Sequence, residues 1–347
     1  MSRLSVFTVD PSAHRPFSLS VPVKLGILLI LLGGGMVAGL LSWSRFSLTL
    51  ADVTNLVLSY DESSIAQQLI LNIRLPRVLS VLMIGASLAV AGVLMQGVTR
   101  NPLASPAILG VNAGAACFMA LSAIGVAVIS ELHPLLCALF GGALGGLMVI
   151  ALGGYLSGHR INPVRLVLAG IAINALLAGL TRAALIIADE MAYSIIYWLA
   201  GSVAEAGWQQ WVLLWPVCTV ALLLSFVLAP QLNTLALGDE VAESLGIGLG
   251  KVRLLAVAAI LVLTAACVAV AGPIAFVGLI VPHVCRALVG RDHRVLLPFA
   301  ALGGAVLLVW ADVLARAIGF PAETPVGVVT ALIGTPFFIF LSAKGRT

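Results

Sequence analysis

Long apolar segments separated by short polar stretches run through nearly the whole chain. Cut at charged residues and at glycine and proline, they give windows of about 20 residues, the length of a helix that crosses the hydrocarbon core of a bilayer. The windows lie near residues 21–43, 76–98, 107–128, 134–156, 164–187, 210–229, 252–271, 274–290, 295–315 and 326–343. The pattern therefore predicts an all-α polytopic membrane protein with about ten transmembrane helices.

Composition supports this interpretation, because 61% of the 347 residues are apolar and only 9% are charged. Soluble proteins carry about 25% charged residues, so this chain lacks the polar surface of a water-soluble fold. The five cysteines stand apart inside apolar stretches, which favours packing over disulfides or metal binding. Residues 1–20 are polar and predict a cytoplasmic tail rather than a secretory signal, with residues 21–347 forming one membrane domain.

The positions of lysine and arginine predict how the chain is oriented. With the N-terminus in the cytoplasm, 13 of the 18 basic residues fall in cytoplasmic segments. The remaining five fall outside, and they are Arg45, Arg74, Arg77, Arg182 and Arg316. Cytoplasmic loops of membrane proteins carry the excess of basic residues, so both termini are predicted to be cytoplasmic. This topology also accounts for the net charge of +4 without any nucleic-acid partner.

Two segments between the predicted spans have distinctive sequences. The longest inner loop, residues 230–253, is amphipathic and has glycines at 238 and 246, which favours two short helices joined by a turn. It is either a helix lying at the membrane surface or a docking element for a cytoplasmic partner. The segment RNPLASP (100–106) cannot continue a helix through its two prolines, and it is either a plain turn or a gate.

Arg74 and Arg77 flank a proline at the outer end of the second window, and Arg316 follows Asp312 by four residues at the same face. Such arginines commonly anchor helices at the interface, and Asp312 and Arg316 could form a local pair. A cluster of outer arginines could also bind carboxylates of a soluble partner. These alternatives remain open on the residues alone.

The chain carries no recognisable catalytic motif, so we expect that it is not an enzyme. The segment GIGLGK (246–251) approaches a phosphate-binding loop, but Leu245 and Val252 stand where that loop needs glycine and serine or threonine. His283 has no second ligand at metal-binding spacing, which favours a structural role. A secondary transporter would show acidic residues at mid-membrane, and Asp312 is the only candidate.

A series of motifs resembles the permeases of type II ATP-binding-cassette importers, the iron-chelate and vitamin B12 uptake family, and the motifs follow one another in the same order as in that family. They are RLPR, GASLAVAG, NPLASPAILGVNAGA, LVLAGIAI, YWLAGS, LALGDEVAESLGI, GPIAFVGLIVPHVCR, DHRVLLP, ADVLAR and PVGVVTALIGTPFFIFL. The resemblance covers residues 21–343, and within the family residues 168–208 look most like a ferric dicitrate permease subunit.

This resemblance implies a permease subunit that imports an iron(III) chelate, ferric dicitrate or a ferric siderophore, across the inner membrane. Vitamin B12 or haem is the alternative cargo. The implied partners are a second permease subunit, identical or paralogous, two cytoplasmic ATPases, and a periplasmic or lipid-anchored substrate-binding protein. ATP and magnesium would bind to the ATPases, so no cofactor is expected in this chain.

The resemblance also implies roles for individual residues. It places docking of the binding protein at Arg74, Arg77 and Arg316, and a cytoplasmic gate at Asn101 and Leu103. Coupling to the ATPase is assigned to Leu237, Gly238, Asp239, Glu243, Leu245 and Gly246. Arg182, in an apolar stretch near the outer side, is a candidate contact for an anionic chelate. Snorkelling, or pairing with Asp189 or Glu190, is the alternative for Arg182.

Overall fold

The computed structural model describes residues 19–154, 163–188 and 192–344, and every regular element in these ranges is a helix. An apolar helix forms in each of the ten windows predicted from the sequence. These helices are α1 (Val21–Leu41), α4 (Leu75–Thr99), α5 (Val111–Ala123), α7 (Pro134–Leu152), α8 (Pro163–Ile187), α10 (Trp208–Val227), α13 (Leu249–Ala271), α14 (Val277–Val289), α15 (His293–Gly319) and α16 (Val326–Lys344). Seven are long and apolar enough to cross a membrane, whereas α5, α14 and the apolar part of α16 are shorter.

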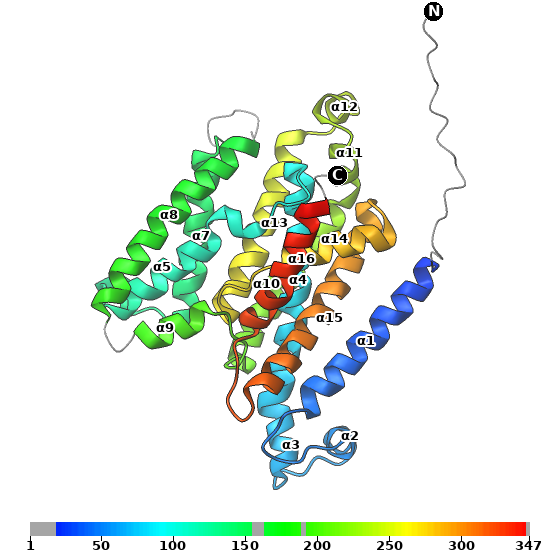
Figure 1. Cartoon of the computed structure of the whole chain (residues 1–347), viewed down its shortest axis with the longest axis vertical. Coiled ribbons are helices and arrows are strands. Elements are labelled where there is room, and N and C mark those ends of the chain that lie inside the picture. Colours follow the sequence, from blue (N-terminus) through cyan, green and yellow to red (C-terminus); the bar gives the residue numbers. More distant parts are fainter. Residues whose placement is uncertain (1–18, 155–162, 189–191, 345–347) are drawn as a thin grey trace, which may run out of the picture.

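Short helices connect these apolar helices at the two ends of the molecule. They are α2 (Leu50–Leu58), α3 (Ile65–Leu69), a π-helical turn (Ile70–Arg74), a 3-10 turn (Pro106–Leu109), α6 (Ala127–Ser130), α9 (Ala192–Leu199), α11 (Ala229–Leu235) and α12 (Asp239–Ser244). The helices α2 and α3 lie at one end, and α11 and α12 lie at the opposite end (Figure 1). Most of the predicted N-terminal tail, residues 1–18, lies outside the described residues.

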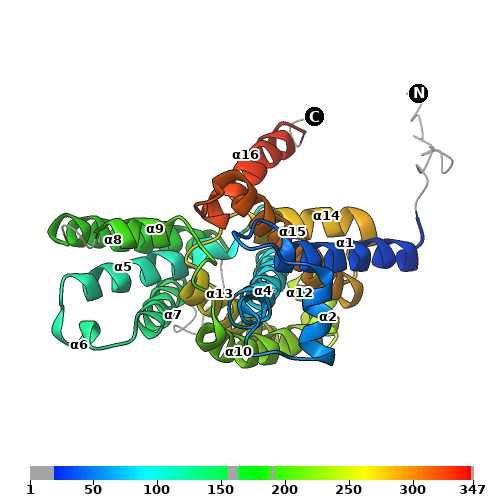
Figure 2. The same cartoon turned by 90° about the horizontal axis from the view of Figure 1, so that it is seen from below.

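Helix α4 forms the centre of the molecule and packs against α10, α13, α14 and α15. A second group, α5, α7 and α8, packs together at one side, and α13 joins the two groups through its contacts with α7. Helix α1 packs along α15 at the opposite edge (Figure 2). The second window is therefore a central helix, and with α3 and the π-helical turn it runs from Ile65 to Thr99, longer than the predicted span.

Glycines allow α4 to approach its neighbours closely enough for backbone contact. A Cβ atom added at Gly85 would overlap the backbone of Gly304 in α15, and one added at Gly92 would overlap the backbone of Gly278 in α14. In a bilayer, small residues at helix contacts permit the close packing that holds a bundle together. Gly304 belongs to the segment ALGGAV (301–306), whose small residues are typical of such contacts, and the close approach of α4 to α15 lies at this segment.

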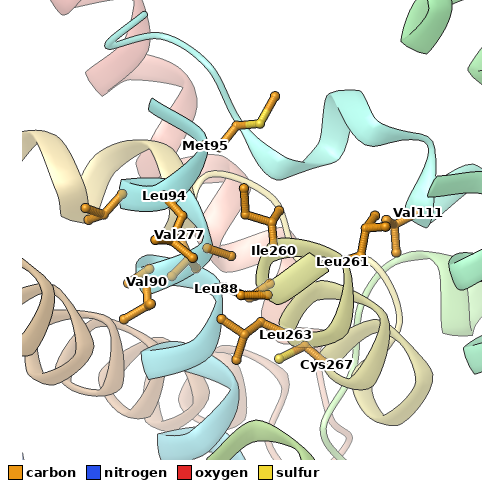
Figure 3. Close-up of a cluster of buried hydrophobic side chains, with 14 of the residues drawn as sticks. Leu88, Val90, Leu94, Met95, Val111, Ile260, Leu261, Leu263, Cys267 and Val277 are labelled. Carbon is orange, nitrogen blue, oxygen red and sulfur yellow. The ribbon is translucent and has the colours of Figure 1, made fainter. Parts of the chain in front are cut away.

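The spaces between these backbone contacts are filled by apolar side chains (Figure 3). Leu88 and Leu94 from α4 pack with Ile260 and Leu263 from α13 and with Val277 from α14, all of them buried. All five cysteines are buried and free of disulfides, as predicted for apolar packing residues. Within the described residues, no group of three or more His, Cys, Asp or Glu could hold a metal ion.

Two windows contain shorter helices than predicted because the backbone leaves the helical conformation at proline and glycine. In window 107–128, α5 begins only after Gly110, which adopts a positive φ of 75°. In window 274–290, α14 begins after Phe276, whose φ is 67°. Irregular backbone at membrane depth must be covered by protein or must line a water-filled space. The segments around Pro106 and Phe276 line one cavity of about 310 Å³.

Candidate functional site

Arg74 and Arg77 lie at the start of α4, on either side of Pro76. Proline cannot donate a backbone hydrogen bond and crowds the carbonyl four residues earlier. The chain just before Pro76 widens into the π-helical turn over Ile70–Arg74, the form that commonly accommodates such a local disruption. This turn sets the direction in which the two arginines leave the helix.

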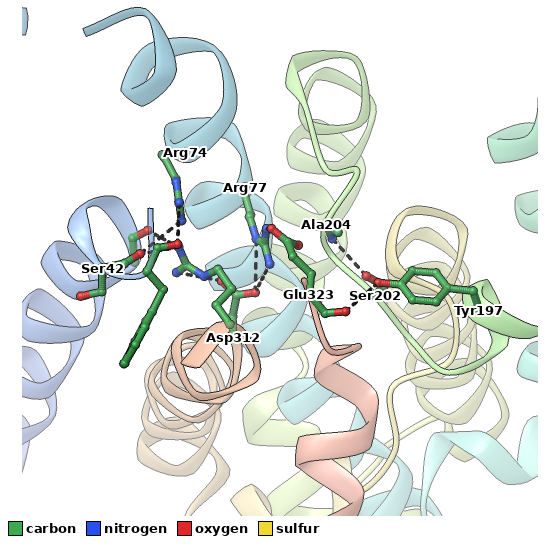
Figure 4. Close-up of polar contacts among 11 residues, drawn as sticks. Ser42, Arg74, Arg77, Tyr197, Ser202, Ala204, Asp312 and Glu323 are labelled. Carbon is green, nitrogen blue, oxygen red and sulfur yellow. Dashed lines mark hydrogen bonds and ion pairs between the residues drawn. The ribbon is translucent and has the colours of Figure 1, made fainter. Parts of the chain in front are cut away.

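Arg77 joins three parts of the chain through its guanidinium group (Figure 4). Its Nη2 and Nε donate to Oδ1 of Asp312 in α15, at 2.8 and 3.2 Å. Its Nη1 donates to both carboxylate oxygens of Glu323, in the loop between α15 and α16, at 2.8 and 2.9 Å. The Arg77 and Asp312 side chains are only 5% and 1% exposed, so this pair is almost completely removed from water.

Arg316 and Arg74 connect this ion pair to the end of α1. Arg316 Nη2 lies 3.2 Å from Asp312 Oδ2, so the local pair predicted from the sequence forms, and its Nη1 donates to the carbonyl of Gly39 at 3.0 Å. Arg74 Nη2 donates to the carbonyl of Trp43 at 3.1 Å. The last carbonyls of a helix have no partner within the helix, and these guanidinium groups supply one.

A hollow of about 200 Å³ lies over this network, at the end of the molecule that the sequence predicts to be the outer one. Its charged lining consists of Arg45, Arg74, Arg77, Arg316 and Glu323. Four arginines and one carboxylate leave the lining positive overall. The Glu323 side chain is 39% exposed and Arg45 is exposed as well, whereas Arg74, Arg77 and Arg316 are buried, so a soluble molecule would reach Glu323 and Arg45 first.

The cytoplasmic loop predicted at 230–253 forms the helices α11 and α12 and the first residues of α13. Gly238 and Gly246 bracket α12 and adopt φ values of 117° and 78°, which other residues rarely adopt. Around them Leu237 and Leu245 are 66% and 63% exposed. Glu243 is exposed on the same short helix. The end of the molecule at α12 therefore presents apolar side chains next to acidic ones.

Asp239, the first residue of α12, forms ion pairs with two arginines from different helices. Arg253 Nη2 in α13 lies 2.8 and 3.0 Å from its two oxygens, and Arg100 at the end of α4 donates to Oδ1. Partial burial raises the pKa of Asp239, but the hydrogen bonds and charges of Arg253 and Arg100 outweigh burial and hold the pKa below its ordinary value. The carboxylate therefore stays ionised at cytoplasmic pH.

The same Arg100 begins the loop that follows α4. Its backbone adopts φ 50° and ends the helix, and its Nε donates to the carbonyl of Leu235 in α11 at 3.1 Å. Asn101 Oδ1 then accepts a hydrogen bond from the Leu103 amide at 2.9 Å, which closes a tight turn around Pro102. Asn101 and Leu103 are both exposed. Through Arg100, this exposed turn is connected directly to α11 and α12.

Arg182 lies apart from both groups, exposed near the end of α8. Its predicted alternative partners, Asp189 and Glu190, lie outside the described residues. His283 makes an edge-on contact with the ring of Phe337 in α16, with the ring centres 5.9 Å apart. That contact agrees with the structural role predicted for His283, although the same side chain also borders a cavity at the end of the molecule that carries α11 and α12.

The helical fold and the order of its elements agree with known transport proteins. A profile described as the FecCD transport family matches residues 27–344. The chain belongs to the FecCD transport family. It is 46% identical to the Fe(3+)-citrate import system permease protein of Bacillus subtilis (strain 168), over 82% of this chain and 84% of that protein.

Two further FecCD-type comparisons cover most of the chain. The Fe(3+) dicitrate transport system permease protein of Escherichia coli (strain K12) is 46% identical over 87% of this chain and 91% of its own length. A solved structure described as an inward-facing conformation of a metal-chelate type ABC transporter superposes with a TM-score of 0.81 at 33% identity, covering 93% of this chain and 99% of that one. The comparisons confirm the resemblance noted in the sequence and identify a multi-pass membrane permease.

Sequence reasoning missed several partners in this FecCD-family structure. Arg45 and Glu323 line the outer hollow, and Arg100 and Arg253 hold Asp239. Arg45 could have been found from the sequence, because it is one of the five basic residues predicted at the outer side. The other three are joined to their partners by the tertiary fold: Glu323 lies 246 positions from Arg77, Arg100 lies 139 from Asp239, and Arg253 lies 14 from Asp239.

Proposed function

We propose that this chain is the permease subunit of an ABC importer that carries an iron(III) chelate inward across the inner membrane. The observation that carries this proposal is the similarity to two citrate permeases along most of the length of all three chains. A separate ATPase supplies the energy, because the chain itself contributes a membrane bundle with docking surfaces at both ends. Ferric dicitrate is the cargo that the two relatives favour.

The proposed topology has ten transmembrane helices and both termini in the cytoplasm, with residues 21–347 as the permease domain. Helix α1 begins, and helix α16 ends, toward the end of the molecule that carries α11 and α12 (Figure 1). The excess of lysine and arginine in the segments on that side supports its assignment to the cytoplasm. The shorter α5 and α14 complete their passage through the irregular segments that precede them.

The outer hollow is the proposed docking position for a substrate-binding protein. Arg74, Arg77 and Arg316 give it a positive potential, which attracts acidic side chains of a soluble partner. Because Arg77 and Arg316 are themselves 4% and 2% exposed, the partner reaches them through the hollow rather than across a flat surface. Glu323 already occupies one side of Arg77, so an incoming carboxylate competes with it.

The cytoplasmic end is the proposed position of the ATPase. Leu237 and Leu245 offer an exposed apolar contact beside Glu243, and Gly238 and Gly246 fix the turns around it. Movement of α12 is passed to the turn at Asn101 and Leu103 through Asp239 and Arg100. The proposed second permease subunit, a copy or a paralogue, lines the other side of the pathway.

ATP-dependent uptake of labelled iron tests this function directly. Vesicles containing this chain with its neighbouring subunits and binding protein would be offered ferric citrate, a ferric hydroxamate, haem and vitamin B12 in parallel. We expect uptake with ferric citrate that requires both ATP and the binding protein. Uptake of another cargo alone would replace the citrate assignment, and uptake driven by an ion gradient without ATP would contradict the importer.

A further inference from the structure

A basic cavity of about 590 Å³ lies at the cytoplasmic end of the bundle, separate from the outer hollow. We define it by its charged and imidazole lining, which comes from three places in the chain and consists of Arg100, His283, Arg286, Arg291 and His293. None of the described residues that line it is aspartate or glutamate. The motifs PHVCR and GRDHR, to which the transport mechanism gives no role, thus meet at one cavity.

The arginines from these motifs lack acidic partners. Among the described residues, neither Arg286 nor Arg291 forms an ion pair, and the two are close enough for their charges to repel each other. Arg286 Nε bonds the carbonyl of Pro282 at 3.2 Å, but its Nη2 is buried with no hydrogen-bond partner in the described part of the chain. A buried cationic donor without a partner is unfavourable unless an anion accepts a hydrogen bond from it.

Two carboxylates near the cavity, Asp239 and Asp292, do not pair with Arg286 or Arg291 but bind other groups. Asp239 pairs with Arg100 and Arg253. Asp292 accepts hydrogen bonds from the Asn233 side-chain amide at 2.6 Å and from the Arg294 backbone amide at 2.9 Å. Among the described residues, therefore, neither Arg286 nor Arg291 has a carboxylate at ion-pair distance.

The surroundings of the cavity indicate where an anion comes from. Val284 and Leu288, on the same helix as Arg286, are 40% and 39% exposed apolar side chains. Lys24, at the start of α1, donates to the carbonyl of Leu288 at 2.6 Å, which brings a further cation to this end of α14. Helix α1 is the least buried of the candidate spans, as expected for a helix that faces lipid. Helix α14 therefore presents basic side chains to the cavity and apolar side chains on its other face, and a phospholipid supplies both a phosphate and acyl chains.

We propose that the basic cavity binds a phosphate oxyanion, presented by the headgroup of an anionic phospholipid of the cytoplasmic leaflet. The phosphate oxygens accept hydrogen bonds from Arg286 and Arg291, while the acyl chains cover Val284 and Leu288. Arginine suits this role because its planar fork can give two parallel hydrogen bonds to a phosphate. The lipid would hold α14 against α1 next to the Arg100 turn.

Native mass spectrometry of the full chain from nanodiscs tests the proposal. The discs would contain phosphatidylcholine with a rising fraction of phosphatidylglycerol, and the retained phosphatidylglycerol would be counted. The double variant Arg286→Gln/Arg291→Gln should lose affinity by about fivefold for each arginine. The variant Arg286→Lys/Arg291→Lys should keep most of it. Arg294→Gln is the matched control, because Arg294 is exposed three residues from Arg291 and does not line the cavity.

Equal retention by the wild type and the double glutamine variant would overturn the proposal, as would an equal loss in Arg294→Gln. A second arm titrates inorganic phosphate into phosphatidylcholine discs. Phosphate binding that needs both arginines, without any preference for phosphatidylglycerol, would overturn the lipid as the source and assign the cavity to a soluble anion. Because the readout is bound lipid, it does not depend on what the permease transports.

Discussion

Arg100 and Asp239 form an ion pair that joins the end of the central helix α4 to the first residue of α12. Arg100 also starts the turn at Asn101 and Leu103, and Asp239 also binds Arg253 in α13. The proposed gate and the proposed ATPase contact are therefore connected by one ion pair, with Arg100 next to the gate and Asp239 in the ATPase contact. Without the charge of Asp239 the turn loses its direct contact with α12 and keeps only the hydrogen bond from Arg100 to the Leu235 carbonyl of α11.

Replacing Asp239 by asparagine should uncouple ATP hydrolysis from transport. Asp239→Asn keeps the size of the side chain but removes the charge that holds Arg100 and Arg253, with a loss of stability of about 1–2 kcal/mol. We expect uptake to fall about tenfold while ATP hydrolysis by the assembled complex persists. The measurement is uptake and hydrolysis in the same vesicles. Glu240→Gln, one residue along the exposed face, is the control, and normal uptake in Asp239→Asn would contradict the link.

The pH dependence of this link follows from the lowered pKa of Asp239. A carboxyl whose folded pKa lies below its unfolded value stabilises the fold above the unfolded pKa, and this stability is lost as pH falls through the folded pKa. The ratio of uptake to hydrolysis should therefore stay constant from about pH 8 down to about pH 5, above the unfolded pKa of roughly 4. A change in the ratio near neutral pH would assign coupling to a different group.

The outer network should be sensitive to its buried carboxylate and tolerant of its exposed one. Asp312 is 1% exposed and shared by Arg77 and Arg316, so Asp312→Asn leaves two buried guanidinium groups short of a charge partner. We expect a loss of about 3–5 kcal/mol, against less than about 1 kcal/mol for Glu323→Gln, whose side chain reaches water. Thermal unfolding in detergent measures both variants. Equal losses would mean that burial does not determine the strength of this network.

Two variants at the outer hollow can separate docking of the binding protein from stability of the fold. Glu323→Gln makes the hollow more positive and frees one side of Arg77, so we expect tighter binding of an acidic binding protein. Arg45→Gln, on the rim of the same hollow, should weaken it with little effect on stability. Binding is measured by titrating the binding protein onto the reconstituted permease at low and high salt, because screening weakens such contacts. Unchanged affinity in both variants would move the docking position elsewhere.

The membrane-spanning pattern could be predicted from the sequence because span length and hydrophobicity are local properties. Each of the ten windows holds a helix, and the glycines of ALGGAV lie at a close helix contact. The partners of the charged residues could not be predicted. Arg77 was expected at an outer surface, yet it is buried by Asp312 and Glu323, residues 235 and 246 positions away. Which charges face water depends on how the helices pack, and no local pattern encodes that.

The contact of α4 with α15 should tolerate no side chain at Gly85. A Cβ atom there meets the backbone of Gly304, which cannot move aside as a side chain could, so Gly85→Ala should separate the helices. We expect a loss of about 1–3 kcal/mol by overpacking. Gly26→Ala on α1, where nothing lies within 4 Å, is the control and should be neutral or slightly stabilising because alanine favours a helix. Thermal unfolding of both variants in detergent makes the comparison.

Arg182 offers a test of cargo charge within the pathway. Its side chain is exposed near the end of α8, among exposed apolar residues such as Leu180 and Ile186, and an arginine in such surroundings is unfavourable unless it meets water or an anion. If it faces the cargo, Arg182→Gln should reduce uptake of anionic ferric citrate by about threefold to tenfold, the effect of one partly screened charge. Arg182→Lys should retain uptake. A chelate without net charge, offered to the same vesicles, should be carried equally by all three forms. An equal reduction for both chelates would assign Arg182 to the stability of α8 instead.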